Sequence, residues 1–172
     1  MKKKIGIYGG SFNPFHEGHM KVIDNILNEN IVDEVWIVPC KRNPLKKDYK
    51  YLTDDERLES IWSYVKELSK VRVMCTELEI DSDKTFTSTT LKEFSEKYPE
   101  YDFYLIIGAD EWQVFNLWKD YGWILDNFKI IVHPRQGYKY IDGGFKNAIY
   151  LDNVESLNIS ATEIRRTLKF QK

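Results

Sequence analysis

The stretch "KIGIYGGSFNPFHEGHMKVIDNIL", residues 4–27, joins a short β-rich run, a pair of glycines and an amphipathic segment. Gly9 and Gly10 let the backbone turn tightly and come close to a ligand. Apolar residues at helical spacing then predict a helix over residues 17–30: Met20, Ile23, Ile26 and Leu27. The stretch therefore predicts a strand, a tight loop and a helix in succession.

Strand-like and helical patterns alternate along the rest of the chain. Strands are expected over residues 32–40, 71–78, 102–108, 128–134 and 148–153. Helices are expected over residues 52–70, 85–99 and 160–170, with a broken helical stretch over 111–125. This alternation favours an α/β fold in which helices cover both faces of a parallel sheet. The length favours one domain over residues 1–172.

The segment 52–70 carries a helix start signal, because Thr53 and Glu56 have the spacing of a capping box. Its apolar residues predict one buried helix face: Leu58, Ile61, Trp62, Val65 and Leu68.

The composition excludes several classes of protein. The 172 residues are 42% hydrophobic and 30% charged with net charge −2, which predicts no general attraction to nucleic acid or to an anionic membrane. Cys40 and Cys75 match neither a disulfide framework nor a zinc motif, so a reducing, cytoplasmic location is expected. The longest apolar runs are too short for a signal peptide or a bilayer span. The composition does not determine the oligomeric state, so a homo-oligomer is one of the alternatives.

Polar or glycine-rich segments follow most of the predicted strands. In a parallel sheet these segments gather at the carboxyl edge, where α/β proteins bind their ligands. We expect a site built from "GGSFNPFH", "PCKRNPLKK", "GADEW" and "HPRQG".

His16 and His19 lie three residues apart, on the same side of the first helical turn. A zinc site would need further ligands, and no cysteine or third histidine is placed nearby in the sequence. Two interpretations are then stronger: capping or core histidines, or N–H donors to a bound phosphate at the helix start.

Two signatures at opposite ends of the chain resemble the nucleotidyltransferase superfamily that contains the HxGH motif. "GGSFNPFHEGH" resembles G-G-S/T-F-D/N-P-x-H-x-G-H, and "NISATEIRRTL", residues 158–168, resembles I-S-S/A-T-x-I/L-R. Within the superfamily, three further segments resemble bacterial nicotinate-nucleotide adenylyltransferases: "TFTSTTLKEF", "IIGADEWQVFNLWKDYGWIL" and "ILDNFKIIVHPRQGY". The resemblance runs from Ile5 to about Leu168.

The resemblance implies a single Rossmann-like, doubly wound domain with a mostly parallel sheet of five to six strands. It also implies transfer of AMP from ATP to nicotinate mononucleotide, giving deamido-NAD and pyrophosphate, with Mg²⁺ held by the ATP phosphates and not by protein side chains. The implied partners are thus small molecules. The implied ATP-binding residues are Gly9, Gly10, Ser11, Phe12, His16, His19, Ser160, Thr162 and Arg165, of which His16, His19 and Arg165 are catalytic. The implied mononucleotide-binding residues are Lys46, Phe86, Thr87, Gly108, Asp110, Trp118 and Arg135.

The residue types suit this reaction. The nucleophile is a phosphate monoester whose second pKa is about 6, so it is an anion at neutral pH without a general base. The reaction instead needs two anions to be aligned and the charge around the five-coordinate phosphorus to be stabilised. Histidine, arginine and lysine donors, a metal ion and a helix N-terminus supply that stabilisation.

Local pattern alone gives several of these residues a structural role. Trp118 follows Phe115 and Leu117 and would by itself be assigned to the core. Asp110 resembles a helix N-cap, as do Ser160 and Thr162, and Arg165 would face solvent.

The chain departs from the family pattern in the predicted mononucleotide segments. Leu45 replaces the histidine of a P-P-H-K/R loop, Phe86 replaces a tyrosine, and Pro134 precedes Arg135 where the family has paired arginines. Most family members also continue past the position of Lys172. These departures leave nicotinamide mononucleotide, another phosphorylated acceptor such as pantetheine phosphate, and a nucleotide-binding module without turnover as alternatives.

Overall fold

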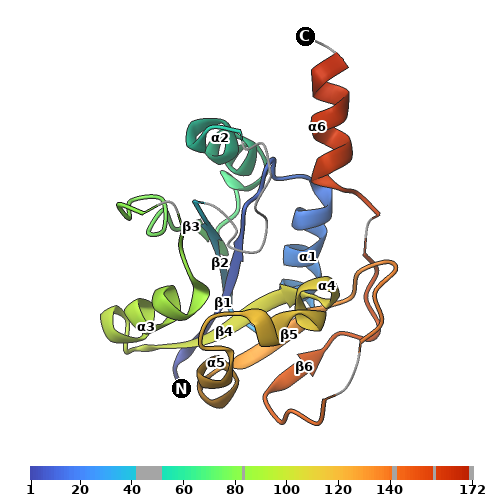
Figure 1. Ribbon diagram of the computed structural model, residues 1–172. Helices are drawn as coiled ribbons and strands as arrows, with labels where there is room; N and C mark the ends of the chain where they lie inside the picture. Colours follow the sequence, from blue (N-terminus) through green and yellow to red (C-terminus); the bar gives the residue numbers. More distant parts are fainter. Residues whose placement is uncertain (42–51, 83, 141–142, 157, 171–172) are drawn as a thin grey trace.

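Strands and helices alternate in the predicted order (Figure 1). The computed structural model describes residues 1–41, 52–82, 84–140, 143–156 and 158–170. The strands are β1 (Lys3–Gly10), β2 (Glu34–Pro39), β3 (Val71–Val73), β4 (Tyr101–Gly108), β5 (Lys129–His133) and β6 (Ala148–Tyr150). The helices are α1 (Glu17–Asn28), α2 (Asp54–Val65), α3 (Thr87–Lys97), α4 (Ala109–Gln113), α5 (Tyr121–Asn127) and α6 (Ala161–Phe170), with a 3₁₀ turn η1 (Phe115–Leu117).

The six strands form one parallel sheet in the order β3-β2-β1-β4-β5-β6. The chain leaves β1 toward β2 and β3, then crosses to β4 on the other side of β1. The sheet therefore has its topological switch point between β1 and β4, where doubly wound folds bind ligands. The expected Rossmann-like, doubly wound sheet of five to six strands is confirmed.

The central strand β1 sends alternate side chains into two core layers. Ile5 and Ile7 pack in one cluster of buried residues, and Tyr8 packs in the other. Gly6 faces the second layer, where a Cβ would lie only 2.6 Å from Ile106 Cδ1. A side chain at position 6 would therefore displace the end of Ile106, and glycine avoids that displacement.

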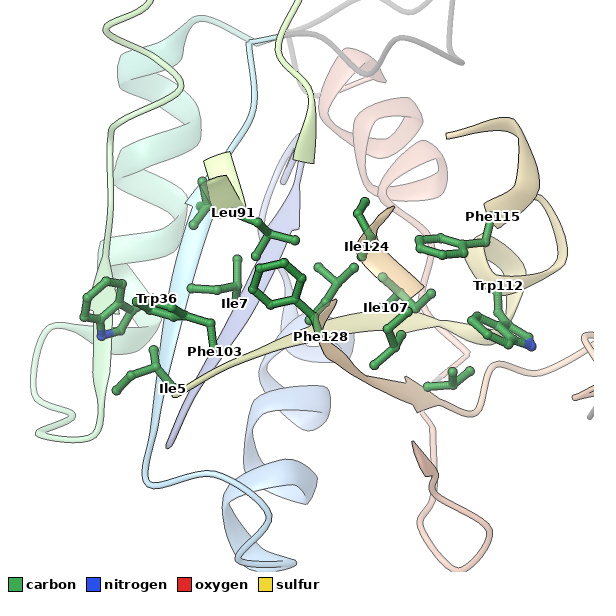
Figure 2. Packing of buried hydrophobic residues seen from close by; sticks show 14 of the residues in the cluster. Ile5, Ile7, Trp36, Leu91, Phe103, Ile107, Trp112, Phe115, Ile124 and Phe128 are labelled. Atoms are coloured by element: carbon green, nitrogen blue, oxygen red, sulfur yellow. The ribbon is translucent and has the colours of Figure 1, made fainter. Parts of the chain in front are cut away.

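Helices cover both faces of the sheet. Figure 2 shows the first cluster, in which Leu91 of α3, Trp112 of α4 and Ile124 of α5 meet the strands. The second cluster holds Ile23 of α1 and Ile61 of α2. Burial of both faces explains why β2 and β4 read as nearly continuous apolar runs.

The buried face predicted for α2 is partly wrong. The capping box is confirmed, since Thr53 and Glu56 each bond the backbone N–H of the other. The buried stripe is Arg57, Ile61 and Val65, spaced four residues apart, whereas Trp62 is 46% exposed because it lies about 100° further around the helix. Leu68 is 39% exposed because α2 ends at Val65.

The ends of the sheet and the last helix differ from the simple pattern. The strand expected over 71–78 stops at Val73, because the chain turns where the Leu78 N–H donates to the Cys75 carbonyl. Figure 1 shows α6 starting beside the N-terminal end of α1 and projecting away from the sheet. None of the described helices is long and apolar enough to span a membrane.

Candidate active site

Two pockets meet at the carboxyl ends of β1 and β4. Gly9, Gly10 and Glu111 line both of them. The larger pocket, about 230 Å³, is lined by His16 and His19 and is called the histidine pocket. The smaller one, about 110 Å³, has Trp118 in its wall and is called the tryptophan pocket.

The histidine pocket brings together residues that are up to about 150 positions apart in the chain. All nine predicted ATP-binding residues line it: Gly9, Gly10, Ser11, Phe12, His16, His19, Ser160, Thr162 and Arg165. It also contains Gly108, Asp110 and Arg135, which the family resemblance assigned to the mononucleotide. Of that second group, Phe86, Thr87 and Trp118 line the tryptophan pocket. Lys46, like Leu45, lies outside the described residues.

His16 and His19 form a capping box at the start of α1. His16 Nδ1 accepts from the Gly18 N–H at 3.0 Å, and His19 Nδ1 accepts from the His16 N–H at 3.1 Å. The two rings stack with centroids 3.8 Å apart. Because both Nδ1 atoms are acceptors, each neutral ring carries its hydrogen on Nε2 and is a donor at that atom. The capping interpretation is therefore confirmed, and it leaves each ring a donor.

His16 is neutral at pH 7. The pKa of His16 is lowered to about 4, mainly because the ring is buried and to a lesser extent because Arg135 is positively charged. The side chain is also largely inaccessible, at 7% exposed. The ring can therefore offer a ligand an N–H dipole but not a full positive charge.

Phe12 shapes the loop between β1 and α1. Its φ is 45°, a left-handed conformation that costs a residue with a side chain about 1–3 kcal/mol. The ring is 3% exposed and packs edge-on against the His19 ring at 5.1 Å and near Phe15 at 5.4 Å. Burial of the ring offsets the backbone strain, and the ring in turn supports His19.

The start of α6 closes the other side of the histidine pocket. Ser160 Oγ accepts from the Glu163 N–H at 3.1 Å, so its predicted capping role is confirmed. Arg165 Nη2 donates to Thr162 Oγ1 at 3.1 Å, and Nη1 donates to the Asn13 carbonyl in the loop after β1. Arg165 is half-buried, so the prediction that it simply faces solvent is wrong.

The two carboxylate oxygens of Asp110 have different surroundings. Its Oδ2 pairs with Arg135 Nη1 at 3.3 Å, while Oδ1 is buried without a hydrogen-bond partner among the described residues. A Cβ on Gly108 would lie 2.5 Å from that Oδ1, so the glycine makes room for it. Gly108 is the N-cap of α4 and Asp110 the second residue of the helix, so the predicted capping role of Asp110 is wrong.

Trp118 packs against the core and also borders a pocket, while its binding of the mononucleotide stays a prediction. It is half-buried, lies 5.1 Å from the Phe115 ring between centroids and packs against the first core cluster. It also lines the tryptophan pocket, which Phe86 and Thr87 at the start of α3 help to form. The α3 N-cap, Phe86, provides no side-chain capping hydrogen bond.

Two buried charged residues near the pockets were not predicted. Glu77 lines the tryptophan pocket and accepts from the hydroxyls of Thr85 at 2.5 Å and Thr90 at 2.6 Å, while burial raises its pKa. Arg57 of α2 donates to the carbonyls of Ser11 at 2.6 Å and Cys40 at 2.7 Å, which ties the loops after β1 and β2 together. The only sequence signal for Arg57 is its position on the four-residue stripe of α2; Glu77 has none.

Comparison with known proteins finds similar chains over nearly the whole length of this one. The sequence model of the family described as cytidylyltransferase-like matches residues 7–167. A protein of Bacteroides thetaiotaomicron named "Probable nicotinate-nucleotide adenylyltransferase" is 34% identical over 99% of this chain and 84% of its own length. A protein with the same name from Flavobacterium psychrophilum is 34% identical over 98% of this chain and 88% of its own length.

This chain belongs to the nicotinate-nucleotide adenylyltransferase family. The resemblance found in the sequence is thereby confirmed. The structure of Plasmodium falciparum nicotinic acid mononucleotide adenylyltransferase complexed with NaAD has a TM-score of 0.81 at 28% identity, covering 96% of this chain and 84% of that one. The same enzyme complexed with APC has a TM-score of 0.78 at 27% identity, covering 95% and 83%. Both pockets lie within the segments that the family model matches.

Proposed function

We propose that this chain transfers AMP from ATP to nicotinate mononucleotide, giving deamido-NAD and pyrophosphate in NAD biosynthesis. The observation that carries the proposal is the pair of pockets joined at Gly9 and Gly10, one with fixed anion donors and one with an aromatic wall. Two substrates bound in adjoining pockets would meet over the glycine turn, to which Gly9 and Gly10 contribute no side chains. The names of the relatives and of the neighbouring structures describe the same chemistry.

The histidine pocket is proposed to hold the phosphates of ATP. His16 and His19 would donate from Nε2, and Arg165 would add a full positive charge from the other wall. The N-terminus of α1 faces the same space, and its backbone dipole favours an anion there. Ser160 and Thr162 are proposed to contact the nucleotide at the α6 end.

The acceptor is proposed to reach across both pockets. Trp118 would stack on the pyridine ring, and the buried Oδ1 of Asp110 would accept a hydroxyl hydrogen from the sugar. The α3 N-terminus, which has no side-chain cap, would suit the ring carboxylate of the nicotinate better than a neutral amide. This last feature favours nicotinate mononucleotide over nicotinamide mononucleotide.

The reaction needs no protein nucleophile. An oxygen of the acceptor phosphate attacks the α-phosphorus of ATP, a new P–O bond forms, and the bond to the bridging oxygen of the β-phosphate breaks. Pyrophosphate leaves with that oxygen. Fixed donors aimed at the charge that develops in such a transition state lower the barrier without reorganisation.

Mg²⁺ is proposed to enter with the ATP phosphates. Among the residues that the structure describes, no three His, Cys, Asp or Glu side chains come together as a metal-binding group. Mg²⁺ in phosphate-transfer sites is commonly held by substrate oxygens and water with few protein ligands. The histidine pocket fits that arrangement, because its histidine and arginine side chains can bind the phosphates and leave the ion to phosphate oxygens and water. When bound, the ion would neutralise charge on the phosphates.

A cytoplasmic location is proposed from the cysteines. Cys40 and Cys75 are both free thiols, as expected in a reducing compartment. The net charge of −2 supports small-molecule partners rather than nucleic acid. That residues 1–172 form a single domain, and that the chain can be a homo-oligomer, stay predictions.

The proposed function is tested by pyrophosphate release. The protein is incubated with ATP, Mg²⁺ and either nicotinate mononucleotide or nicotinamide mononucleotide, and the dinucleotide product is identified by mass. We expect faster release, and deamido-NAD, with nicotinate mononucleotide. Faster release with nicotinamide mononucleotide would contradict the proposal that nicotinate mononucleotide is the acceptor. Release with neither acceptor would favour a binding module or a different phosphorylated acceptor, with pantetheine phosphate as the next to be assayed.

A further inference from the structure

The third histidine of the chain, His133, ends β5 at the wall of the histidine pocket. It is 2% exposed and lies opposite Gly108 in the sheet register. Its Nε2 is 2.8 Å from the side-chain nitrogen of Asn25, a residue of α1 that is 8% exposed. Its Nδ1 is 2.8 Å from the Pro134 carbonyl oxygen. Neither Asn25 nor His133 has a part in the proposed chemistry.

The partners of His133 determine which nitrogen carries its hydrogen. The Pro134 carbonyl can only accept, so His133 Nδ1 must donate. The Asn25 amide nitrogen can only donate, so His133 Nε2 must accept. His133 is therefore a neutral ring with its hydrogen on Nδ1, the opposite tautomer to His16 and His19 in the same pocket. Burial also lowers the pKa of His133, in agreement with a neutral ring.

The Asn25 amide uses its second hydrogen on the segment that leads into α6. Asn25 Nδ2 donates to the Glu155 carbonyl at 2.8 Å. Ser156, Ile159 and Ser160, which follow, line the histidine pocket. A Cβ on Gly18 would lie 3.6 Å from the Ile159 Cβ, so this segment lies against the first turn of α1. One amide thus joins α1, the end of β5 and the segment before α6.

We propose that Asn25 and His133 form a positioning pair that holds the backbone at Glu155, and with it the pocket-lining Ser156, against α1 and so sets the geometry of the ATP end of the site. The proposal rests on the assignment of ATP to the histidine pocket. A buried donor and acceptor that satisfy each other fix one arrangement, because each alternative leaves a polar atom unpaired away from water. Neither residue touches the reacting atoms, so both act through the segment that they hold.

The test compares two asparagines in the same kind of bond. Asn25→Leu is measured against Asn147→Leu, since Asn147 Nδ2 also donates to a distant carbonyl at 2.8 Å, that of Leu125. That bond joins α5 to the residue before β6, and neither of these elements lines either pocket. We expect Asn25→Leu to raise the KM for ATP about tenfold, the effect of losing one or two hydrogen bonds, with the KM for the mononucleotide within about twofold. Asn147→Leu should leave both KM values within about twofold.

A second pair of variants keeps the test decisive if Asn25→Leu does not fold. His133→Gln retains an acceptor and a donor on one side chain, whereas His133→Phe retains neither. We expect His133→Phe to raise the KM for ATP as Asn25→Leu does, and His133→Gln to restore most of it. Equal rises in both KM values, or no change in the KM for ATP, would overturn the positioning role.

Imidazole ¹⁵N shifts give a readout that does not depend on turnover. The chain has three histidines, and we expect one Nδ1–H tautomer, at His133, and two Nε2–H tautomers. An Nε2–H ring at His133 would overturn the pair. Calorimetry with ATP alone, on the wild type and on Asn25→Leu, separates the proposals: an inactive wild type that still binds ATP more tightly than the variant would refute only the proposed reaction. Equal ATP affinity of the two proteins would refute the positioning pair.

Discussion

Single hydrogen bonds decide what each histidine can do. In His16 and His19, Nδ1 accepts from a backbone N–H at the start of α1 and Nε2 carries the hydrogen. In His133, Nδ1 donates to the Pro134 carbonyl and Nε2 accepts from Asn25. The residue type is the same in all three positions, and the neighbouring backbone and amide groups assign different roles. A pattern of histidines alone therefore says little until the partner of each ring nitrogen is known.

His19 provides the sharpest residue-scale prediction. We expect His19→Ala to lower turnover by a factor of about 10²–10⁴, because a donor to the charge of the transition state is lost. The rate of pyrophosphate release measures the effect, and circular dichroism checks that the variant stays folded. Unchanged activity in a folded variant would contradict the catalytic assignment.

His16 predicts a specific effect of pH on stability. Its folded-state pKa is about 4, against about 6.5 in an unfolded chain, so the unfolded state binds more protons between these values. The stability from the neutral ring is complete above pH 6.5 and falls as the pH drops toward 4, by at most about 1.4 kcal/mol per pH unit.

Urea unfolding of the wild type and of His16→Gln at pH 7.5 and pH 5 measures this effect. The loss between the two pH values should be smaller in His16→Gln, because the titrating group is absent. An equal loss in both proteins would show that other groups cause it.

At the scale of an element, α2 shows how closely a helix face is defined. Ile61 is fully buried and its neighbour Trp62 is 46% exposed. We expect Ile61→Ala to lower the free energy of unfolding by about 2–5 kcal/mol, through lost burial and a residual cavity. Trp62→Ala should change it by less than about 1 kcal/mol.

Denaturant unfolding of the two neighbouring variants tests the helix register. Similar losses for Ile61→Ala and Trp62→Ala would mean that the face of α2 is turned from the one described. Hydrophobicity alone would place both Ile61 and Trp62 on the buried face of α2. Large apolar residues are not confined to the interior, so the two variants distinguish this prediction from the observed face.

At the scale of the whole molecule, the proposed function assigns the ATP phosphates to the histidine pocket and the pyridine ring to the tryptophan pocket. Trp118 lines only the tryptophan pocket, so we expect Trp118→Ala to raise the KM for the mononucleotide more than the KM for ATP. Loss of one base-stacking ring costs about 1–3 kcal/mol in comparable aromatic contacts, a rise of about 5- to 150-fold. Steady-state kinetics with each substrate varied in turn measures both values. Equal effects on the two would indicate a purely structural role in the core.

Much of the fold could be read from local pattern. The helical spacing in 17–28, the capping box of α2 and the apolar run of β4 each depend on neighbours in sequence, and each was predicted. The burial of Arg57 and Glu77 could not be predicted, because a buried charge depends on carbonyls and hydroxyls supplied by other segments. The early end of β3 depended likewise on a turn that hydrophobicity does not reveal.

The sequence by itself determined the order of strands and helices, the glycine turn after β1 and the two ends of the nucleotide signature. These are local properties, set by backbone freedom and side-chain periodicity. The tertiary structure alone decided that Asp110 and Arg135 join the histidine pocket, and that His133 meets Asn25 across 108 positions of sequence. Those contacts follow from strand order and register, which depend on many weak packing interactions acting together and on no single motif.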